Sequence, residues 1–232
     1  MDLILEGFRK ALELVLTLDR EVLGITLLSL EVSASATAIS VLVGVAAGTA
    51  IALGTFPGKR LLVSVVNTGM GLPPVVVGLF VSMLLWRNGP LGALGLLYTP
   101  TAIVIAQAVI ATPIVTGITI GAIQGLPPSL RLQILALGAT RAQLVWMLVR
   151  EARIPLLAGV MAGFGGVISE VGASIMVGGN IKGQTRVLTT ATVMETGKGN
   201  FDVAIALSAI LLALTLAVNV ALTLVQQRTR PR

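Results

Sequence analysis

The chain has 232 residues, of which 55% are hydrophobic, 11% are charged and 3% are aromatic, and its formal net charge is +6. Soluble domains carry about 25% charged residues, so this composition excludes a soluble fold that covers its core with polar side chains. The sequence has no Cys and no His, which excludes disulfides, thiolate chemistry and imidazole metal sites. Few catalytic options remain, and we expect no catalytic residue and no metal site on this chain.

Long apolar runs predict a helical membrane protein. A hydrocarbon core of about 30 Å needs about 20 apolar residues in a helix. The runs are continuous, whereas strands of an outer-membrane barrel alternate apolar and polar residues over about 10 positions. We predict an all-α membrane protein with about five transmembrane helices. The five apolar segments are residues 26–52, 61–86, 100–123, 154–177 and 201–225.

The first 22 residues have a different pattern. Apolar residues recur there at roughly helical spacing beside charged ones, which predicts an amphipathic helix at the membrane interface. A sixth span over residues 3–18 is the alternative, and it would place charged residues in lipid at about 3 kcal/mol each. The apolar positions are Leu3, Ile4, Phe8, Leu12, Val15 and Leu16, and the charged ones are Glu6, Arg9, Lys10 and Glu13. The predicted organisation is an amphipathic segment at 1–22, a membrane domain at 23–227 and a basic tail at 228–232.

Three of the apolar segments contain residues that bear on helix packing or on function. Gly44 and Gly48 form a GxxxG pattern in the first, which indicates either close helix packing or a chance pair in a glycine-rich chain. Pro73 and Pro74 interrupt the second, either as a simple kink or as part of a substrate path, because broken backbone in a membrane needs a protein or water partner. Glu170 lies in the fourth, and an ionisable group within a span is a candidate functional residue.

The charges predict how the chain lies across the membrane. With five spans, the loop at Lys59, the segment 129–153 and the C-terminus share one side. That side holds nine basic residues and Glu151, whereas the opposite side holds seven basic and seven acidic residues. Basic residues clustered in short loops favour the cytoplasmic side. We therefore expect a cytoplasmic C-terminus and an external N-terminus.

Residues 126–153 form a polar interval between two spans. From Leu135 onward it reads LALGATRAQLVWMLVREARIPLL, which resembles the coupling loop of type I ABC importer permeases, where two short helices joined at a Gly dock into the ATPase subunit. The family's Glu-Ala-Ala is replaced here by Leu132, Gln133 and Ile134, and an ordinary cytoplasmic connection is the alternative. The residues that the resemblance assigns to ATPase coupling are Leu137, Gly138, Ala139, Thr140 and Arg141.

Three further segments resemble one branch of that family, the tungstate-type permeases (TupB). They are VNTGMGLPPVVVGL at residues 66–79, GPLGALGLLYTPTAIVIAQ at 89–107 and ISEVGASIMVGGNIKGQTRVLTTA at 168–191. Molybdate permeases share part of the last pattern. The resemblance covers nearly all of residues 26–225. It implies the transmembrane domain of a type I ABC importer for an oxyanion, tungstate first, with molybdate and sulfate as alternatives.

The resemblance also implies a transport subunit without catalytic activity of its own. Two copies would form the path across the cytoplasmic (inner) membrane, and an extracytoplasmic binding protein would deliver the anion. ATP and Mg would be held by a dimer of separate cytoplasmic ATPases, with no cofactor on this chain and no role for nucleic acid. The GTFPGKR sequence at residues 54–60 is no P-loop, because a Walker A motif has four residues between its glycines and Ser or Thr after Lys.

The loop 178–200 carries basic and hydroxyl side chains that suit the passage of a tetrahedral oxyanion or contact with a binding protein or lipid headgroups. A carboxylate facing the anion would repel it, so we expect buried Glu170 to hold backbone N–H groups or a basic partner. The alternative function is an ion-gradient-coupled carrier or an intramembrane enzyme that uses Glu170. The candidate residues for the anion path or the binding-protein contact are Pro73, Pro74, Lys182, Thr185 and Arg186.

Overall fold

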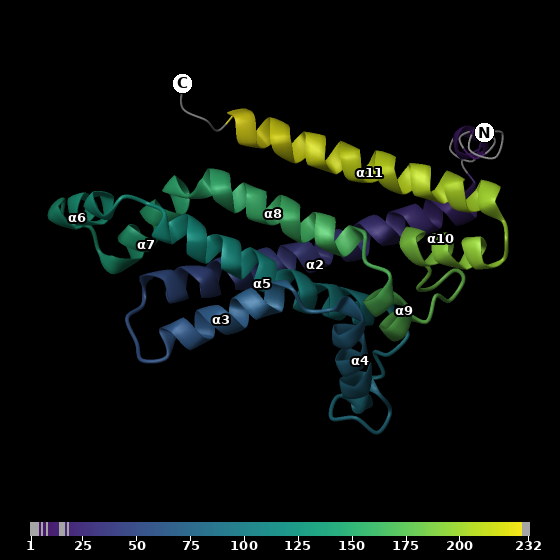
Figure 1. Ribbon diagram of the computed structural model, residues 1–232, viewed down its shortest axis with the longest axis horizontal. Helices are drawn as coiled ribbons and strands as arrows, with labels where there is room; N and C mark the ends of the chain where they lie inside the picture. The colour runs from purple at the N-terminus through teal and green to yellow at the C-terminus, as the bar shows by residue number, and fades with distance from the viewer. Residues whose placement is uncertain (1–4, 6, 8, 14–16, 18, 229–232) are drawn as a thin grey trace.

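The computed structural model describes residues 5, 7, 9–13, 17 and 19–228, and within these residues it contains helices and no strand (Figure 1). The predicted all-α class is confirmed. In chain order the elements are α2 (Arg20–Leu53), α3 (Lys59–Met70), α4 (Pro74–Leu85), the short 3₁₀ turn η1 (Gly92–Leu94), α5 (Pro100–Gln124), α6 (Pro128–Ala136), α7 (Arg141–Glu151), α8 (Arg153–Ile168), α9 (Gly172–Gly178), α10 (Leu188–Gly197) and α11 (Phe201–Arg228).

The five predicted spans correspond to three unbroken helices and two bent pairs. Helices α2, α5 and α11 are each long and apolar enough to cross a membrane. The pair of α3 and α4 is bent by 101° at the Pro73–Pro74 break, and the pair of α8 and α9 is bent by 59°. The second bend was not predicted, because the segment 154–177 reads as one apolar run around Glu170.

The predicted amphipathic segment falls largely outside the described residues, since these omit residues 1–4, 6, 8, 14–16 and 18. Residues 9–13 are helical. Helix α2 then begins at Arg20, where the Asp19 carboxylate caps it by accepting a hydrogen bond from Val22 N–H at 2.9 Å. Of the predicted basic tail, residues 229–232 also lie outside the described part of the chain.

The bundle is built around α5, which packs against α2 and α8. Small residues bring α2 and α5 together: a Cβ added to Gly48 would lie 2.6 Å from Thr119 Cβ and 2.8 Å from the Thr116 carbonyl oxygen. A Cβ added to Gly44 would lie 2.9 Å from Val115 Cβ. The GxxxG pattern therefore serves specific helix packing, and the reading as a chance pair is wrong.

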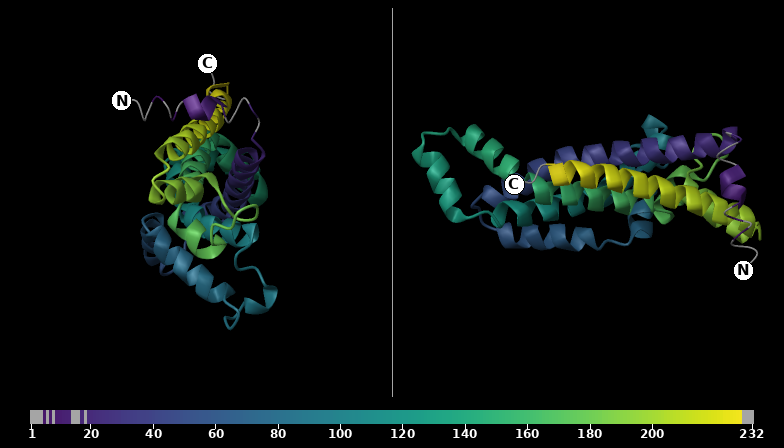
Figure 2. Two further views of the ribbon diagram at one scale, coloured as in Figure 1. Left: turned by 90° about the vertical axis from the view of Figure 1, so that its right-hand side faces the viewer. Right: turned by 90° about the horizontal axis from the view of Figure 1, so that it is seen from above.

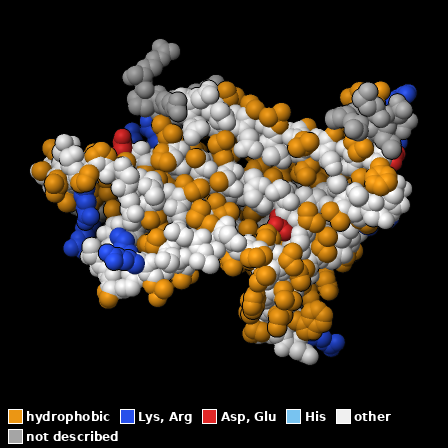
Figure 3. Space-filling model, in the orientation of Figure 1, with side chains coloured by type: hydrophobic (Ala, Val, Ile, Leu, Met, Phe, Trp, Pro, Cys, Tyr) orange, Lys and Arg blue, Asp and Glu red, His pale blue; other side chains and the backbone are white. Residues whose placement is uncertain are grey.

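The two ends of the elongated bundle carry different segments (Figure 1, Figure 2). The α2–α3 turn, the α6–α7 hairpin and the C-terminal end of α11 lie at one end, while α10 and the start of α2 lie at the other. Figure 3 shows Lys and Arg side chains gathered at the first end. The segments that the charge pattern assigned to one side of the membrane are thus together in space.

Helix α4 leaves the bundle sideways (Figure 1). One side of α4 packs against α9 through Val77, Gly78, Val81 and Leu85, whereas its remaining surface is apolar and exposed (Figure 3). The sequence predicted an interruption at the two prolines, but it did not predict that α4 would turn away from the line of α3.

Candidate transport and coupling sites

The α6–α7 hairpin protrudes from the end of the bundle that carries the basic loops (Figure 1). Gly138 joins its helices with φ of +81°, a left-handed conformation that a residue with a Cβ adopts at a cost. Thr140 starts α7 with a capping box, because its hydroxyl accepts from Gln143 N–H at 3.3 Å while the Gln143 side chain accepts from Thr140 N–H at 2.8 Å. The turn is therefore fixed by local chemistry.

The hairpin has a buried face and an exposed apolar face. Ile134, Leu144 and Leu148 pack with Ile123 at the end of α5, which anchors the hairpin to the bundle. On the outer face Leu137 is 86% exposed. The guanidinium of Arg150 lies 5.2 Å from the centre of the Trp146 ring. Further exposed apolar side chains on the hairpin are Leu132, Leu135, Val145, Trp146 and Met147.

The break between α8 and α9 is organised by Glu170, whose side chain is only 8% exposed. Its carboxylate accepts a hydrogen bond from Ala173 N–H at 2.9 Å at the start of α9, and its carbonyl oxygen accepts from the Thr189 hydroxyl at 2.9 Å. Nearby, the Gln107 amide donates to the Val167 carbonyl at 3.1 Å. These polar groups satisfy the backbone that the break frees within an apolar region.

Replacing Glu170 with alanine should lower the free energy of unfolding by about 1–2 kcal/mol, because Ala173 N–H then loses its buried acceptor. The Glu170→Gln variant keeps an acceptor oxygen and should unfold within about 0.5 kcal/mol of the unmodified protein. Thermal unfolding of both variants in detergent, followed by circular dichroism, checks this. Equal destabilisation by both substitutions would show that the negative charge, and not the acceptor, is needed.

The candidate residues of the loop 178–200 are held by internal contacts. Lys182 and Arg186 both pair with Glu21 of α2, at 2.6 Å and 3.3 Å, and Lys198 pairs with Glu195 at 2.8 Å. The hydrogen bond from Lys198, with a second from Asn200, lowers the pKa of the Glu195 carboxyl. Thr185 is fully buried, and its hydroxyl donates to the Gly178 carbonyl. These ion pairs neutralise much of the positive charge that the loop would otherwise present to an anion.

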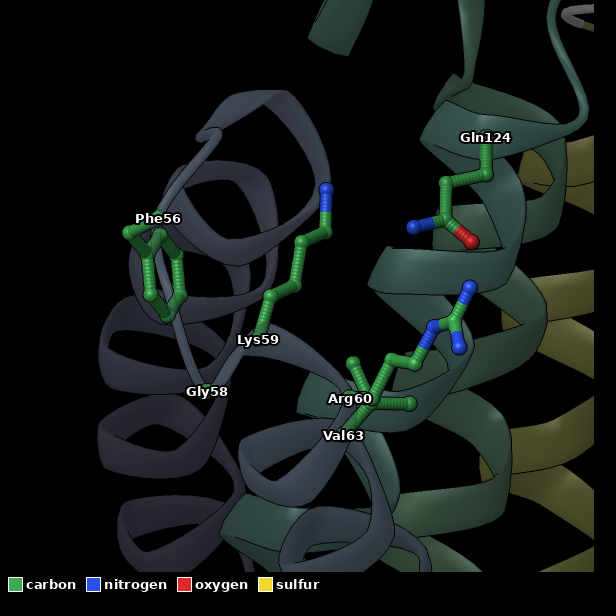
Figure 4. A pocket seen from close by; sticks show the side chains of 6 residues that line it. All are labelled: Phe56, Gly58, Lys59, Arg60, Val63 and Gln124. Atoms are coloured by element: carbon green, nitrogen blue, oxygen red, sulfur yellow. The ribbon is translucent and has the colours of Figure 1, made fainter.

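A cavity of about 650 Å³ lies where the α2–α3 turn meets the end of α5. Figure 4 shows the Arg60 guanidinium, from α3, and the Gln124 carboxamide, from α5, pointing toward each other. Lys59 is engaged differently, since its ammonium donates to the Ala52 and Gly54 carbonyls at 2.8 and 2.9 Å at the end of α2. Sequence reasoning counted Arg60 as a loop charge and did not single out Gln124.

Apolar spans, two of which are bent pairs of helices, together with a protruding helical hairpin, are typical of a membrane protein of the transporter class. Residues 40–231 match the family model described as binding-protein-dependent transport system inner membrane component, and the chain belongs to this family.

The relatives agree with the resemblance seen in the sequence. The chain is 44% identical over 200 residues to a probable anion ABC transporter permease protein of Haloferax volcanii, covering 84% of this chain and 86% of that one. It is 40% identical over 227 residues to the tungstate uptake system permease protein TupB of Peptoclostridium acidaminophilum, covering 98% and 100%. It is 31% identical over 183 residues to the molybdenum transport system permease protein ModB of Escherichia coli, covering 75% and 80%.

Solved structures share the fold. An inward-facing structure of the MetNI methionine ABC transporter superposes with a TM-score of 0.75 at 18% identity, covering 94% of this chain and 99% of that one. An amino acid ABC transporter structure gives a TM-score of 0.67 at 20% identity, covering 92% and 96%. The predicted type I ABC importer transmembrane fold is confirmed.

Proposed function

We propose that this chain is the membrane-spanning subunit of an ATP-driven importer for an oxyanion, with tungstate as the first candidate and molybdate and sulfate as alternatives. The main structural support for this proposal is the α6–α7 hairpin, which presents Leu137 at its turn and Trp146 on α7 as exposed side chains beyond the end of the bundle. An exposed apolar patch of this kind is typical of a docking surface. The names of the relatives, which include anion, tungstate and molybdenum permeases, support the substrate class.

The hairpin turn contacts a cytoplasmic ATPase in this proposal, through Leu137, Gly138, Ala139, Thr140 and Arg141. ATP and Mg are bound by that partner, which forms a dimer. Closure of the two ATPases on ATP pushes the hairpin, and the contact of Ile134, Leu144 and Leu148 with the end of α5 carries the movement into the bundle.

A second copy of the chain completes the path, and an extracytoplasmic binding protein delivers the anion near the loop 178–200. The end that bears the hairpin and the basic loops lies in the cytoplasm, with the C-terminus, in accordance with the positive-inside rule. The N-terminus lies on the external side of the cytoplasmic membrane. Opening of the Glu21 pairs would free the charges of Lys182 and Arg186 to attract the arriving anion.

The test is reconstitution of this chain into proteoliposomes with a candidate ATPase and a candidate oxyanion-binding protein from the same organism. We expect the loaded binding protein to stimulate both ATP hydrolysis and anion uptake, with tungstate, molybdate and sulfate compared as substrates. Omission of the ATPase or of the binding protein should remove uptake. Uptake that persists without ATPase and collapses with an ionophore would contradict the proposal and favour a carrier that uses Glu170.

A further inference from the structure

Helix α3 has one polar face. Arg60, Ser64, Asn67 and Thr68 recur at helical spacing, and all four are exposed. Among the helices of the two bent pairs, α3 is the one that the structure describes with no buried residue. The polar face is thus presented along most of the length of a helix that belongs to a membrane span.

The polar face points away from the bundle. A helix has about 3.6 residues per turn, which puts Gly69 on the side opposite Arg60. Gly69 faces α5, since a Cβ added there would lie 2.8 Å from Pro113 Cβ. Met70 also faces α5, because its sulfur would lie 2.5 Å from a Cβ added to Gly117. The Ser64, Asn67 and Thr68 side chains therefore project from the outside of one copy, while the longer Arg60 side chain, at the start of the face, reaches back toward Gln124 of α5 (Figure 4).

Lipid is an unfavourable neighbour for this face. The Ser64 and Thr68 hydroxyls donate to carbonyls of α3 itself, at 3.0 and 2.9 Å. The Asn67 amide and the Arg60 guanidinium make no hydrogen bond or ion pair with any residue that the structure describes. Polar groups at membrane depth face protein or a water-filled path, so a second copy or water must cover them.

The charges around this face favour an anion. The sequence has no Asp and no Glu between Glu31 and Glu151, a stretch that includes α3, α4 and α5. Arg60 and Gln124 meet at the cavity at the start of α3 (Figure 4). A guanidinium and an amide both donate hydrogen bonds, and no carboxylate from these helices would repel an oxyanion.

We propose that the polar face of α3 lines the route of the oxyanion between two copies of the chain, and that Arg60 and Gln124 form its last binding position before the cytoplasm. The proposal rests on the proposed function for the identity of the substrate and for the second copy. Asn67 and the hydroxyls of Ser64 and Thr68 replace hydration water along the route, while Arg60 attracts the anion to its exit.

Cysteine labelling tests the route directly, because the chain has no cysteine of its own. In the reconstituted complex, Ser64→Cys and Thr68→Cys should react with a charged methanethiosulfonate, since thiolates form in water. Val65→Cys is the matched control, because Val65 is 59% exposed in one copy but lies outside the polar face, and it should stay unmodified in lipid. Excess tungstate should slow the labelling of Thr68→Cys. Equal labelling of Val65→Cys, or none at Ser64 and Thr68, would overturn the route.

Uptake gives a second readout. Asn67→Leu and Arg60→Gln should each reduce tungstate uptake roughly tenfold, the factor that corresponds to about 1.4 kcal/mol. The Arg60→Lys variant keeps the positive charge and should take up more tungstate than Arg60→Gln. Asn219→Leu is the control, since Asn219 sits on α11 and donates to the Thr215 carbonyl at 3.0 Å. Unchanged uptake with Asn67→Leu in a correctly assembled complex would overturn the proposal. Labelling needs no ATP hydrolysis. If the route proposal is wrong, the labelling pattern fails, whereas if ATP-driven import is wrong, uptake no longer depends on the ATPase.

The Arg60 position could also receive the phosphate of a lipid headgroup, which shares the chemistry of a free oxyanion. Val63→Cys, which lines the same cavity, distinguishes the two sources. In phosphatidylcholine nanodiscs, tungstate should slow labelling of this thiol. Protection that requires phosphatidylglycerol and ignores tungstate would overturn the exit position and assign the cavity to lipid.

Discussion

The Gly48→Ala substitution should lower the free energy of unfolding by about 1–3 kcal/mol relative to the unmodified protein. This is the usual cost of forcing an extra group into a packed contact. The added Cβ would lie 2.8 Å from the Thr116 carbonyl oxygen and 2.6 Å from Thr119 Cβ. The first of these is backbone and cannot swing away, so α2 and α5 must separate. Because α5 also supports α8 and α3, the loss should spread through the bundle, and Gly48→Leu should prevent folding.

Two control variants lie at glycines with open space around them, one on each of the two helices. Gly24 of α2 and Gly121 of α5 have no atom within 4 Å of an added Cβ, so Gly24→Ala and Gly121→Ala should be neutral or gain about 0.5–1 kcal/mol from helix propensity. Urea unfolding in detergent, followed by circular dichroism, measures all three. If Gly48→Ala were as stable as Gly24→Ala, the α2–α5 contact would be looser than the structure indicates.

Much of the fold follows from local signals in the sequence. Apolar length predicts the spans, since lipid requires continuous helices of about 20 residues. Pro73 and Pro74 predict the first break, because proline has no N–H for the helix ladder. The hairpin turn at Gly138 follows from a glycine between two helical stretches, and its φ of +81° agrees with that role.

The direction of α4 and the second break could not be predicted, since both depend on packing between distant segments. The bend at Glu170 is stabilised by Thr189, which belongs to α10. The Lys182 and Arg186 pairs with Glu21 join residues far apart in the sequence, so a loop that reads as a free basic surface is largely neutralised in the structure.

The polar face of α3 is a different case, because its signal was present in the sequence. Arg60, Ser64, Asn67 and Thr68 have the spacing of one helix face. The mean hydropathy of the segment 61–86 combines these polar residues with the apolar run of α4, so the polar face is hidden in the average. Arg60 falls just before that window, where it counts as a loop charge. Gln124, toward which Arg60 points, is brought near it only because α3 and α5 lie side by side (Figure 4).

Substitution of Leu137 by aspartate should abolish ATP-driven uptake while leaving the fold intact. Leu137 is 86% exposed, so the free subunit tolerates a charge there. In the proposed complex the same side chain is buried against the ATPase, where an unpaired carboxylate costs at least about 2 kcal/mol. That cost corresponds to a loss of affinity of roughly 30-fold. Co-purification of the ATPase and the rate of uptake in proteoliposomes measure the effect.

Two control variants distinguish loss of the contact between Leu137 and the ATPase from a nonspecific loss of folding. Leu137→Met keeps an apolar side chain of similar volume and should retain uptake. Leu5→Asp places the same charge at a leucine that is 76% exposed in the N-terminal segment, and it should leave ATPase binding unchanged. If Leu137→Asp bound the ATPase and transported normally, the hairpin turn would lie outside the coupling contact. The exposed face of α7 around Trp146 would then be the surface that receives the movement of the ATPase.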